Sequence, residues 1–393
     1  MNEKIEQLVE KHLDDIVKIR RCIHENPELG MEENETSKLV AKELEKLGLE
    51  VETGVANTGV VGLLRGKEEG KTILLRADMD ALPITEKTGL EFSSKNDGKM
   101  HACGHDVHTS ILLGVAKVLT EMKDEIKGNI KFVFQPAEEM NPTGGARYMI
   151  EEGVLENPKV DAAFALHVWG EKVGTVAVRR GTMMAQSDRL FITVKGKASH
   201  ASQPHNGDDA ILAAAQILVA LQSIISRNVD PMESAVITVG TIKGGTRYNV
   251  LCDEVVLEGT VRTFNEKVAE MMPGKIKNLA ENIAEAMGCS AEVEYVKGYS
   301  MTSNNEELAD IAIESFKDIL GEENVIIPEH PASGSEDFSE FTKSVPSVFY
   351  WLGLESDKNI GKTTLHNPNL VVDEDCIPVG IKSMSKLALD YLK

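Results

Sequence analysis

The densest cluster of polar side chains in the sequence is the run from Met100 to His108, which contains three histidines and one cysteine. Cys103 and His105 stand two positions apart, a spacing that lets both side chains reach one metal ion from a loop. Thiolate and imidazole are both good ligands for zinc and similar ions. An apolar helical pattern follows directly, and the N-terminus of that helix would help to keep Cys103 ionised. The run therefore predicts a metal site.

Two adjacent carboxylates, Glu138 and Glu139, follow the apolar stretch 130–134. Because this stretch has the composition of a buried strand, two merely solvated glutamates are the less attractive interpretation. Adjacent residues of an extended chain point in opposite directions, so the pair cannot act as one bidentate group. We expect the two carboxylates to divide the work, with one binding a metal and the other handling protons.

Two further histidines stand alone, His167 at the end of the apolar stretch 162–166 and His366 in a polar loop. Either one by itself would more often be structural. Five candidates stand at or beyond the carboxyl end of a predicted strand: Cys103, His105, Glu138, Glu139 and His167. Open α/β sheets place ligand sites at this edge. A mixture of sulfur, nitrogen and oxygen ligands leaves coordination positions open, which is typical of a catalytic metal site.

The elements that must position these residues alternate along the chain. Amphipathic helices are predicted at about 3–22 and 39–47, and an apolar helix at 111–119. Buried strands are predicted at 72–77, 130–134, 162–166 and 347–352. Short apolar strands with intervening helices indicate an α/β fold with a mainly parallel sheet that helices cover on both faces.

The hydrophobic pattern changes near residue 187, where apolar and polar residues begin to alternate, and Leu190, Ile192 and Val194 indicate a half-exposed strand. A helix at 208–226, strands at 235–242 and 254–264, a helix at 266–287 and a strand at 290–296 follow. This order is that of a ferredoxin-like α+β unit. We therefore expect a catalytic domain of residues 1–186 and 299–393, with an inserted domain at 187–298. The helix at 208–226 is apolar nearly all round, so a loop or a subunit interface must cover its second side.

Composition narrows the possible partners. The 393 residues carry a net charge of −21, with 42% hydrophobic and 27% charged residues. Such a charge argues against a nucleic-acid polymer as the partner. No apolar run approaches the ~18 residues of a membrane helix. The five cysteines show no CxxC pair, which indicates a reducing compartment rather than a disulfide framework. We expect a soluble, cytoplasmic protein with neither nucleic acid nor membrane as partner.

The chain as a whole resembles the co-catalytic metallohydrolases of the aminoacylase and carboxypeptidase type. Within them it is most similar to the branch of hippurate hydrolases, bacterial N-acyl-amino-acid amidohydrolases and plant auxin-conjugate hydrolases. The resemblance is carried by segments 20–30, 75–84, 100–106, 135–139, 196–205, 334–338 and 365–368. No single segment is specific, but the set is.

The resemblance implies a centre of two divalent metal ions, for which zinc, manganese, cobalt or nickel would suit the ligands. The implied ligands are Cys103 bridging both ions, His105 and His167 on one ion, and Glu139 and His366 on the other. Glu138 would be the general base. Asp80 matches the aspartate that orients a ligand in the family.

The resemblance also implies that the inserted domain, 187–298, is a lid and the dimerisation domain of a homodimer. His200 would contact the scissile carbonyl across the dimer, although His205 competes for this role. Asn249 and Arg262 match positions that hold the carboxylate or the oxyanion of the substrate.

The expected function is hydrolysis of the amide bond of a small-molecule N-acyl amino acid, hippurate-like or N-acetylated, by a metal-activated water. A dipeptidase, a carboxypeptidase or an N-acetyl-diaminopimelate deacetylase would use the same site. A thiol hydrolase with Cys103 as nucleophile would leave Glu139 and the distant histidines without a role. A metal-binding interaction protein remains the non-enzymatic alternative, and it would hydrolyse no amide.

Overall fold

The computed structural model describes residues 1–393 and divides into two compact units. Unit 1 consists of Met1–Met183, Thr302–His330 and Asp337–Lys393, and unit 2 of Met184–Met301 and Pro331–Glu336. Unit 2 thus contains the whole predicted insertion, 187–298, together with a short segment that returns to it later in the chain.

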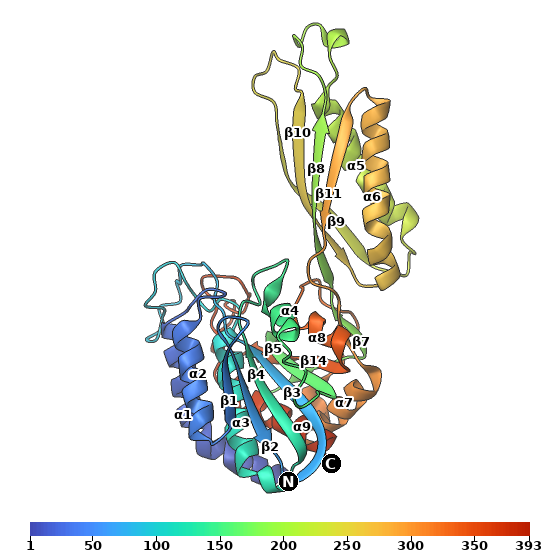
Figure 1. The fold of residues 1–393 in the computed structure, drawn as a ribbon. Helices are drawn as coiled ribbons and strands as arrows, with labels where there is room; N and C mark the ends of the chain where they lie inside the picture. The colour runs from blue at the N-terminus through green and yellow to red at the C-terminus, as the bar shows by residue number, and fades with distance from the viewer. The chain divides into compact units, whose positions relative to one another are not determined.

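The elements of unit 1 are labelled in Figure 1. Its helices are α1 (Asn2–Glu25), α2 (Asn34–Lys46), α3 (His105–Glu121), α4 (Gly144–Glu151), α7 (Glu306–Leu320), α8 (Ser339–Ser344) and α9 (Cys376–Tyr391), with 3-10 turns η1 (Lys123–Glu125) and η3 (Glu322–Asn324). Its strands are β1 (Glu50–Val55), β2 (Gly59–Arg65), β3 (Glu68–Asp78), β4 (Lys127–Gln135), β5 (Ala162–Lys172), β6 (Val176–Ala177), β12 (Thr302–Asn304), β13 (Val325–Ile326) and β14 (Ser347–Glu355). Strand β7 (Gly181–Met184) pairs with β12 and ends at the unit boundary.

The main sheet of unit 1 has the strand order β1-β2-β4-β3-β5-β14-β6-β13. Its centre is parallel, because β3 pairs in parallel with both β4 and β5, and β5 pairs in parallel with β14. The pairs β1–β2, β2–β4 and β6–β14 are antiparallel. The predicted fold class, a mainly parallel sheet covered by helices, is confirmed.

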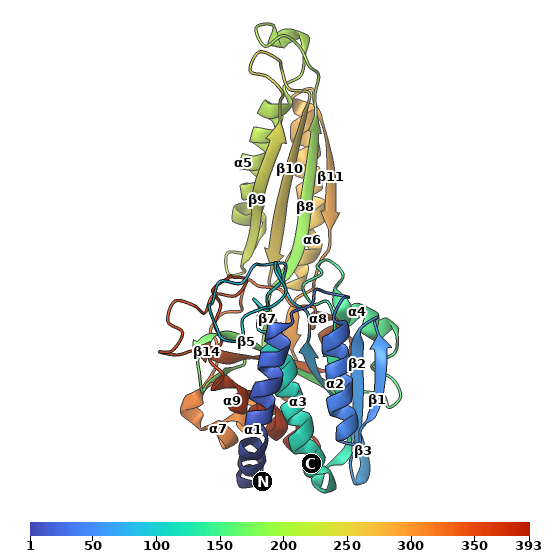
Figure 2. The same cartoon turned by 90° about the vertical axis from the view of Figure 1, so that its left-hand side faces the viewer.

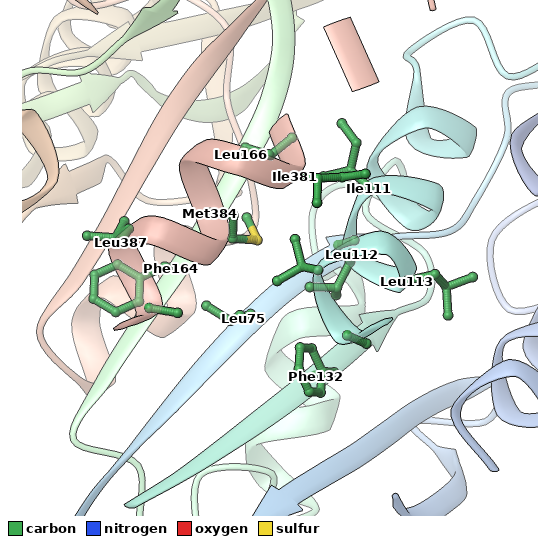
Figure 3. Packing of buried hydrophobic residues seen from close by; sticks show 14 of the residues in the cluster. Leu75, Ile111, Leu112, Leu113, Phe132, Phe164, Leu166, Ile381, Met384 and Leu387 are labelled. Atoms are coloured by element: carbon green, nitrogen blue, oxygen red, sulfur yellow. The ribbon is translucent and has the colours of Figure 1, made fainter. Parts of the chain in front are cut away.

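The core of unit 1 lies between this sheet and the helices α3 and α9. Side chains such as Ile111 and Leu112 of α3 and Met384 of α9 are buried against Leu75 and Phe164 of the strands (Figure 3). Helix α3 is buried almost all round because α1 and α9 both contact it. Each such large apolar side chain contributes roughly 1.5–3 kcal/mol when it is fully buried. This packing fixes the start of α3, where the candidate site begins.

Unit 2 contains the four-stranded antiparallel sheet β11-β8-β10-β9. Its elements are β8 (Gln186–Lys195), η2 (Pro204–Asn206), α5 (Ala210–Asn228), β9 (Ala235–Gly244), β10 (Glu254–Thr263), α6 (Glu266–Ala286) and β11 (Ser290–Val296). Both helices contact the sheet on the same face (Figure 2). This strand order and helix placement are those of the predicted ferredoxin-like unit.

No loop of the chain covers the second apolar side of helix α5. Within the chain nothing covers Ile211, Leu212 and Val219, whose exposed fractions are 50%, 50% and 71%. By length and composition alone, α5 is also the one helix that could cross a membrane, which corrects the expectation that no such stretch exists. A single helix of this kind is weak evidence, since core helices pass the same test.

Candidate active site

Asp80 connects two parts of the candidate site. It lies two residues after the end of β3 and is buried. Its Oδ1 and Oδ2 accept hydrogen bonds from the backbone N–H groups of Glu138 and Glu139, each at 3.0 Å. Its backbone carbonyl accepts a hydrogen bond of 2.8 Å from Nδ1 of His105. One residue therefore holds both the loop after β4 and the first residue of α3.

The hydrogen bond to Asp80 fixes the tautomer of His105. A carbonyl oxygen can only accept, so Nδ1 of His105 carries the hydrogen and Nε2 presents a lone pair when the ring is neutral. Nε2 is buried and has no hydrogen-bond partner, as expected of a nitrogen that binds a metal. Burial lowers the pKa of His105, but Asp78 and Asp80 outweigh it and raise the pKa to about 10. A cation binding at Nε2 would displace that proton.

The ligand atoms of the predicted residues come together at the carboxyl edge of the sheet. Three groups have their ligand atoms within 4.8 Å of one another: Cys103, His105 and His167; Cys103, Glu139 and His366; and His105, Glu138 and Glu139. The Cys103 Sγ lies 3.5 Å from Nε2 of His167, and Nε2 of His366 lies 3.0 Å from Oε1 of Glu139. The structure thus brings all five predicted ligands together with Glu138, and the mixed sulfur, nitrogen and oxygen donors fit divalent transition ions.

Local backbone contacts orient the two distant histidines. His167 lies in β5 and donates from Nδ1 to its neighbouring carbonyl, that of Val168, at 2.7 Å, which leaves its Nε2 lone pair toward Cys103. His366 has a left-handed backbone with φ of 58°. Its N–H donates to the carbonyl of Ala102 at 2.7 Å, and this bond ties the 363–368 loop to the residue before Cys103.

The thiol of Cys103 does not behave as the sequence suggested. Cys103 precedes Gly104, the N-cap of α3, yet burial and the neighbouring carboxylates of Glu139 and Glu138 raise its pKa well above the usual range. In the protein without metal, burial and these carboxylates outweigh the help that the helix N-terminus was expected to give. The proton would leave only when a cation offsets the negative charge around it.

The expectation that Glu138 and Glu139 point in opposite directions is also wrong. Strand β4 ends at Gln135, and the chain turns through Ala137, whose φ of 57° is left-handed. The two glutamates therefore stand in a turn rather than in an extended chain. Carboxylate oxygens of both come within 4.8 Å of each other and of a ligand atom of His105.

His108 is a residue whose role the sequence left open. Its Nε2 accepts a hydrogen bond from the N–H of Val168 at 2.8 Å, and its Nδ1 donates to Oδ1 of Asp78 at 2.6 Å. Arg76 forms a buried ion pair with the other oxygen of Asp78 at 2.7 Å. Because both ring nitrogens are used, His108 supports the backbone next to His167 and presents no free lone pair. Its position three residues after His105 on α3 was the available signal.

The remaining predicted site residues belong to unit 2. His200 follows β8, and its Nδ1 accepts hydrogen bonds from the N–H of Ser202 at 3.1 Å and from its hydroxyl at 2.7 Å. The neutral ring therefore carries its hydrogen on Nε2. His205 is exposed in the turn η2. The Oδ1 of Asn249 is buried without a partner, and Arg262 on β10 donates to the carbonyl of Val261 at 3.2 Å.

The chain is similar to known proteins over almost its whole length. Residues 74–390 match the model of peptidase family M20/M25/M40. The chain is 41% identical over 392 residues to thermostable carboxypeptidase 2 of Saccharolobus solfataricus, covering 99% of this chain and 98% of that protein. It is 41% identical to N-acetyl-L-cysteine deacetylase of Bacillus subtilis, with 92% and 84% covered. It is also 41% identical to IAA-amino acid hydrolase ILR1-like 4 of Arabidopsis thaliana, with 96% and 86% covered.

Among solved structures, the fold is similar to that of the YXEP protein of Bacillus subtilis, described as a dinuclear metal binding peptidase from the M20 family. The TM-score is 0.85 at 34% identity, covering 98% of this chain and 99% of that one. The whole-length matches and the family model indicate the same family. The chain therefore belongs to peptidase family M20/M25/M40, and it is a metal-dependent hydrolase of amide bonds.

Proposed function

We propose that this protein hydrolyses the amide bond of N-acyl amino acids at a centre of two divalent metal ions. The observation that carries the proposal is that the five ligand side chains form overlapping clusters, one of which contains the buried Glu138. Similarity to a deacetylase of N-acetyl-L-cysteine and to a hydrolase of IAA-amino acids supports this substrate class. The substrate is a hippurate-like or an N-acetyl amino acid.

The proposed ligands are those that the family resemblance implies. Cys103, His105, His167, Glu139 and His366 would together hold the two ions. Zinc, manganese, cobalt and nickel all suit this donor set. When bound, such a pair supplies Lewis acidity that activates a water and polarises the substrate carbonyl.

The residues of the chain handle the protons and orient the substrate. Glu138 would accept the proton of the attacking water and later deliver it to the leaving amine, a role worth about 10²–10⁴ in rate. His200 would donate from Nε2 to the developing oxyanion, which agrees with the tautomer that Ser202 imposes. Arg262, with Asn249, would bind the free carboxylate of the amino acid, since a guanidinium matches a carboxylate with two hydrogen bonds.

The proposal includes a homodimer formed through the inserted domain. Three exposed apolar side chains on α5 support it, as do Val236 and Ile242 on β9, which are 43% and 54% exposed. Strand β9 is at the edge of its sheet, and an edge strand readily pairs with another chain. A cytoplasmic location, without nucleic acid or membrane as partner, stays a prediction.

Carboxypeptidase or dipeptidase activity is the second candidate, favoured by the full-length similarity to thermostable carboxypeptidase 2. A deacetylase of N-acetyl-diaminopimelate would also use these residues. Hydrolysis rates for benzoyl, acetyl and indole-acetyl amino acids, compared with those for dipeptides, separate the candidates. A chelator should abolish the activity, whereas a thiol hydrolase would lose activity to an alkylating agent alone.

Replacing the proposed base tests the mechanism. Glu138→Gln should lower kcat by about 10²–10⁴ while the metal content stays that of the wild type, because Glu138 is not among the five ligands. Elemental analysis and steady-state kinetics give both values. Glu45→Gln, an exposed glutamate on α2, is the matched control and should change neither. Turnover retained in Glu138→Gln would remove Glu138 from the role of base.

A further inference from the structure

Three consecutive backbone N–H groups in the loop after β4 are each bound by a buried carboxylate. The N–H groups of Glu138 and Glu139 donate to the two oxygens of Asp80. The N–H of Ala137 donates to Oε1 of Glu33 at 2.9 Å, across a sequence separation of 104 residues. The loop that carries the proposed base is therefore held from two distant parts of the chain.

This loop needs such support because its backbone is strained. Ala137 has a φ of 57°, a left-handed conformation that side chains with a Cβ adopt at a cost. Strained backbone persists only where the surroundings determine it strongly. Ala137 is fully buried, so its N–H relies on the carboxylate of Glu33 as its acceptor.

Glu33 is an unusual residue to find in this position. Its side chain is fully buried at the N-cap of α2, and its Oε2 accepts a hydrogen bond from the hydroxyl of Thr58 at 2.5 Å. It forms no ion pair with a basic side chain. Burial raises its pKa to about 7, a tendency that the Thr58 bond opposes and the charge of Asp80 reinforces. A buried carboxylate without a counter-ion is unfavourable by itself. The hydrogen bond to the loop gives a reason for keeping it at this position.

We propose that Glu33 is a positioning residue of this hydrolase, which holds Ala137 in the left-handed turn that directs Glu138 toward the metal ligands. Glu33 acts through the backbone and touches none of the predicted ligands. The expected effect of Glu33 on turnover rests on the proposed function, whereas its effect on the loop does not. The ordering of the loop can be measured without any substrate.

Two substitutions separate positioning from simple packing. Glu33→Ala removes the acceptor of the Ala137 N–H. Glu33→Gln keeps it, because the amide oxygen can accept from Ala137 while the amide NH₂ donates to the hydroxyl of Thr58. Glu32→Ala, at an exposed neighbour paired with Lys99 at 3.1 Å, is the matched control.

Amide hydrogen exchange of residues 137–140 in the full-length, metal-saturated protein is the first measurement. In Glu33→Ala these amide hydrogens should exchange about tenfold faster than in the wild type. In Glu33→Gln and Glu32→Ala their exchange rates should stay within about twofold of the wild-type rate. Exchange at the wild-type rate in Glu33→Ala, or equally fast exchange in Glu33→Gln, overturns the proposal. If Glu33→Ala does not fold, Thr58→Val takes its place, because it removes the hydroxyl that holds the other oxygen of Glu33. This variant should also accelerate amide exchange of the segment. An unchanged exchange rate then overturns the proposal.

Turnover by the same variants is the second measurement. At saturating metal, Glu33→Ala should lower kcat by about tenfold to a hundredfold with little change in KM, and Glu33→Gln should restore most of the loss. An unchanged kcat in Glu33→Ala contradicts the positioning role. Absence of amide hydrolysis in the wild type would instead contradict the proposed function, and the exchange result would still decide the role of Glu33 in the loop.

Discussion

At the residue scale, Glu33 makes the stability of the protein depend on pH. Its pKa rises from about 4.5 to about 7 on folding, first because of burial. Between these values the folded protein holds a proton that the unfolded chain has released, so the free energy of unfolding falls as pH rises from about 4.5 to about 7.

The variant Glu33→Gln should therefore gain stability relative to the wild type as the pH rises through this window. The gain should reach on the order of 3 kcal/mol and remain constant above the window. Denaturant unfolding of both proteins at several pH values measures the difference. A difference that is the same at pH 4.5 and pH 7.5 would contradict this assignment.

The sequence indicated which residues of the candidate site come together, but not their local geometry. Cys103, His105 and His167 could be found because ligand-type side chains follow apolar strands or precede an apolar helix. The left-handed turn at Ala137 could not be found, since no glycine marks it. The bond from Glu33 joins positions 104 residues apart, and a pattern within one segment cannot indicate such a partner. The same holds for the contact of His108 with the N–H of Val168.

At the element scale, the entry into α3 depends on Gly104. Its φ is 84°, and a Cβ at this position would lie 2.4 Å from Cγ2 of Val168, the residue after His167. Gly104→Ala should therefore destabilise the protein by about 1–3 kcal/mol and weaken metal binding, because Val168 must move.

Gly98→Ala provides the control for this prediction. Gly98 has a similar φ of 77° but nothing within 4 Å of a Cβ, so its substitution adds only the backbone strain. Thermal unfolding and metal titration of the two variants separate strain from steric overlap. Equal effects in both variants would show that the contact with Val168 is unimportant.

Four strands with a continuous apolar stretch were found from the sequence, but β2, α7 and α9, whose apolar residues are also buried, were missed. The sequence predicted β3, β4, β5 and β14, because each contains a continuous buried stretch. Strand β1 is mostly exposed and polar, and β6 and β13 have two residues each, too few for a periodicity. These three strands form through their pairing with neighbouring strands rather than through a pattern of their own.

At the scale of the whole molecule, the apolar surface of unit 2 predicts self-association. Wild-type protein should sediment as a particle of twice the chain mass of 42.9 kDa. Val219→Lys, which places a charge on the exposed face of α5, should shift it toward the monomer. Glu292→Ala, at an exposed residue of β11 on the opposite edge of the sheet, is the control and should leave the dimer unchanged. A wild-type protein that sediments only as 43-kDa particles would contradict the dimer.

The division into a larger α/β unit and an inserted ferredoxin-like unit could be seen in the change of hydrophobic period near residue 187. The return of Pro331–Glu336 to unit 2 could not, because this segment has no periodic pattern and joins its unit only through long-range contacts. Its Ala332 accepts a hydrogen bond from the N–H of Ala185, far earlier in the chain.

The most direct test of the account is the position of bound metal in a crystal of the zinc- or manganese-loaded protein, measured by anomalous scattering. We predict two peaks roughly 3.5–4 Å apart, with the sulfur of Cys103 between them and nitrogen or oxygen ligands from His105, His167, Glu139 and His366. Metal bound elsewhere, or an ordered site in which these five side chains do not contact it, would contradict the proposed metal centre and the mechanism built on it.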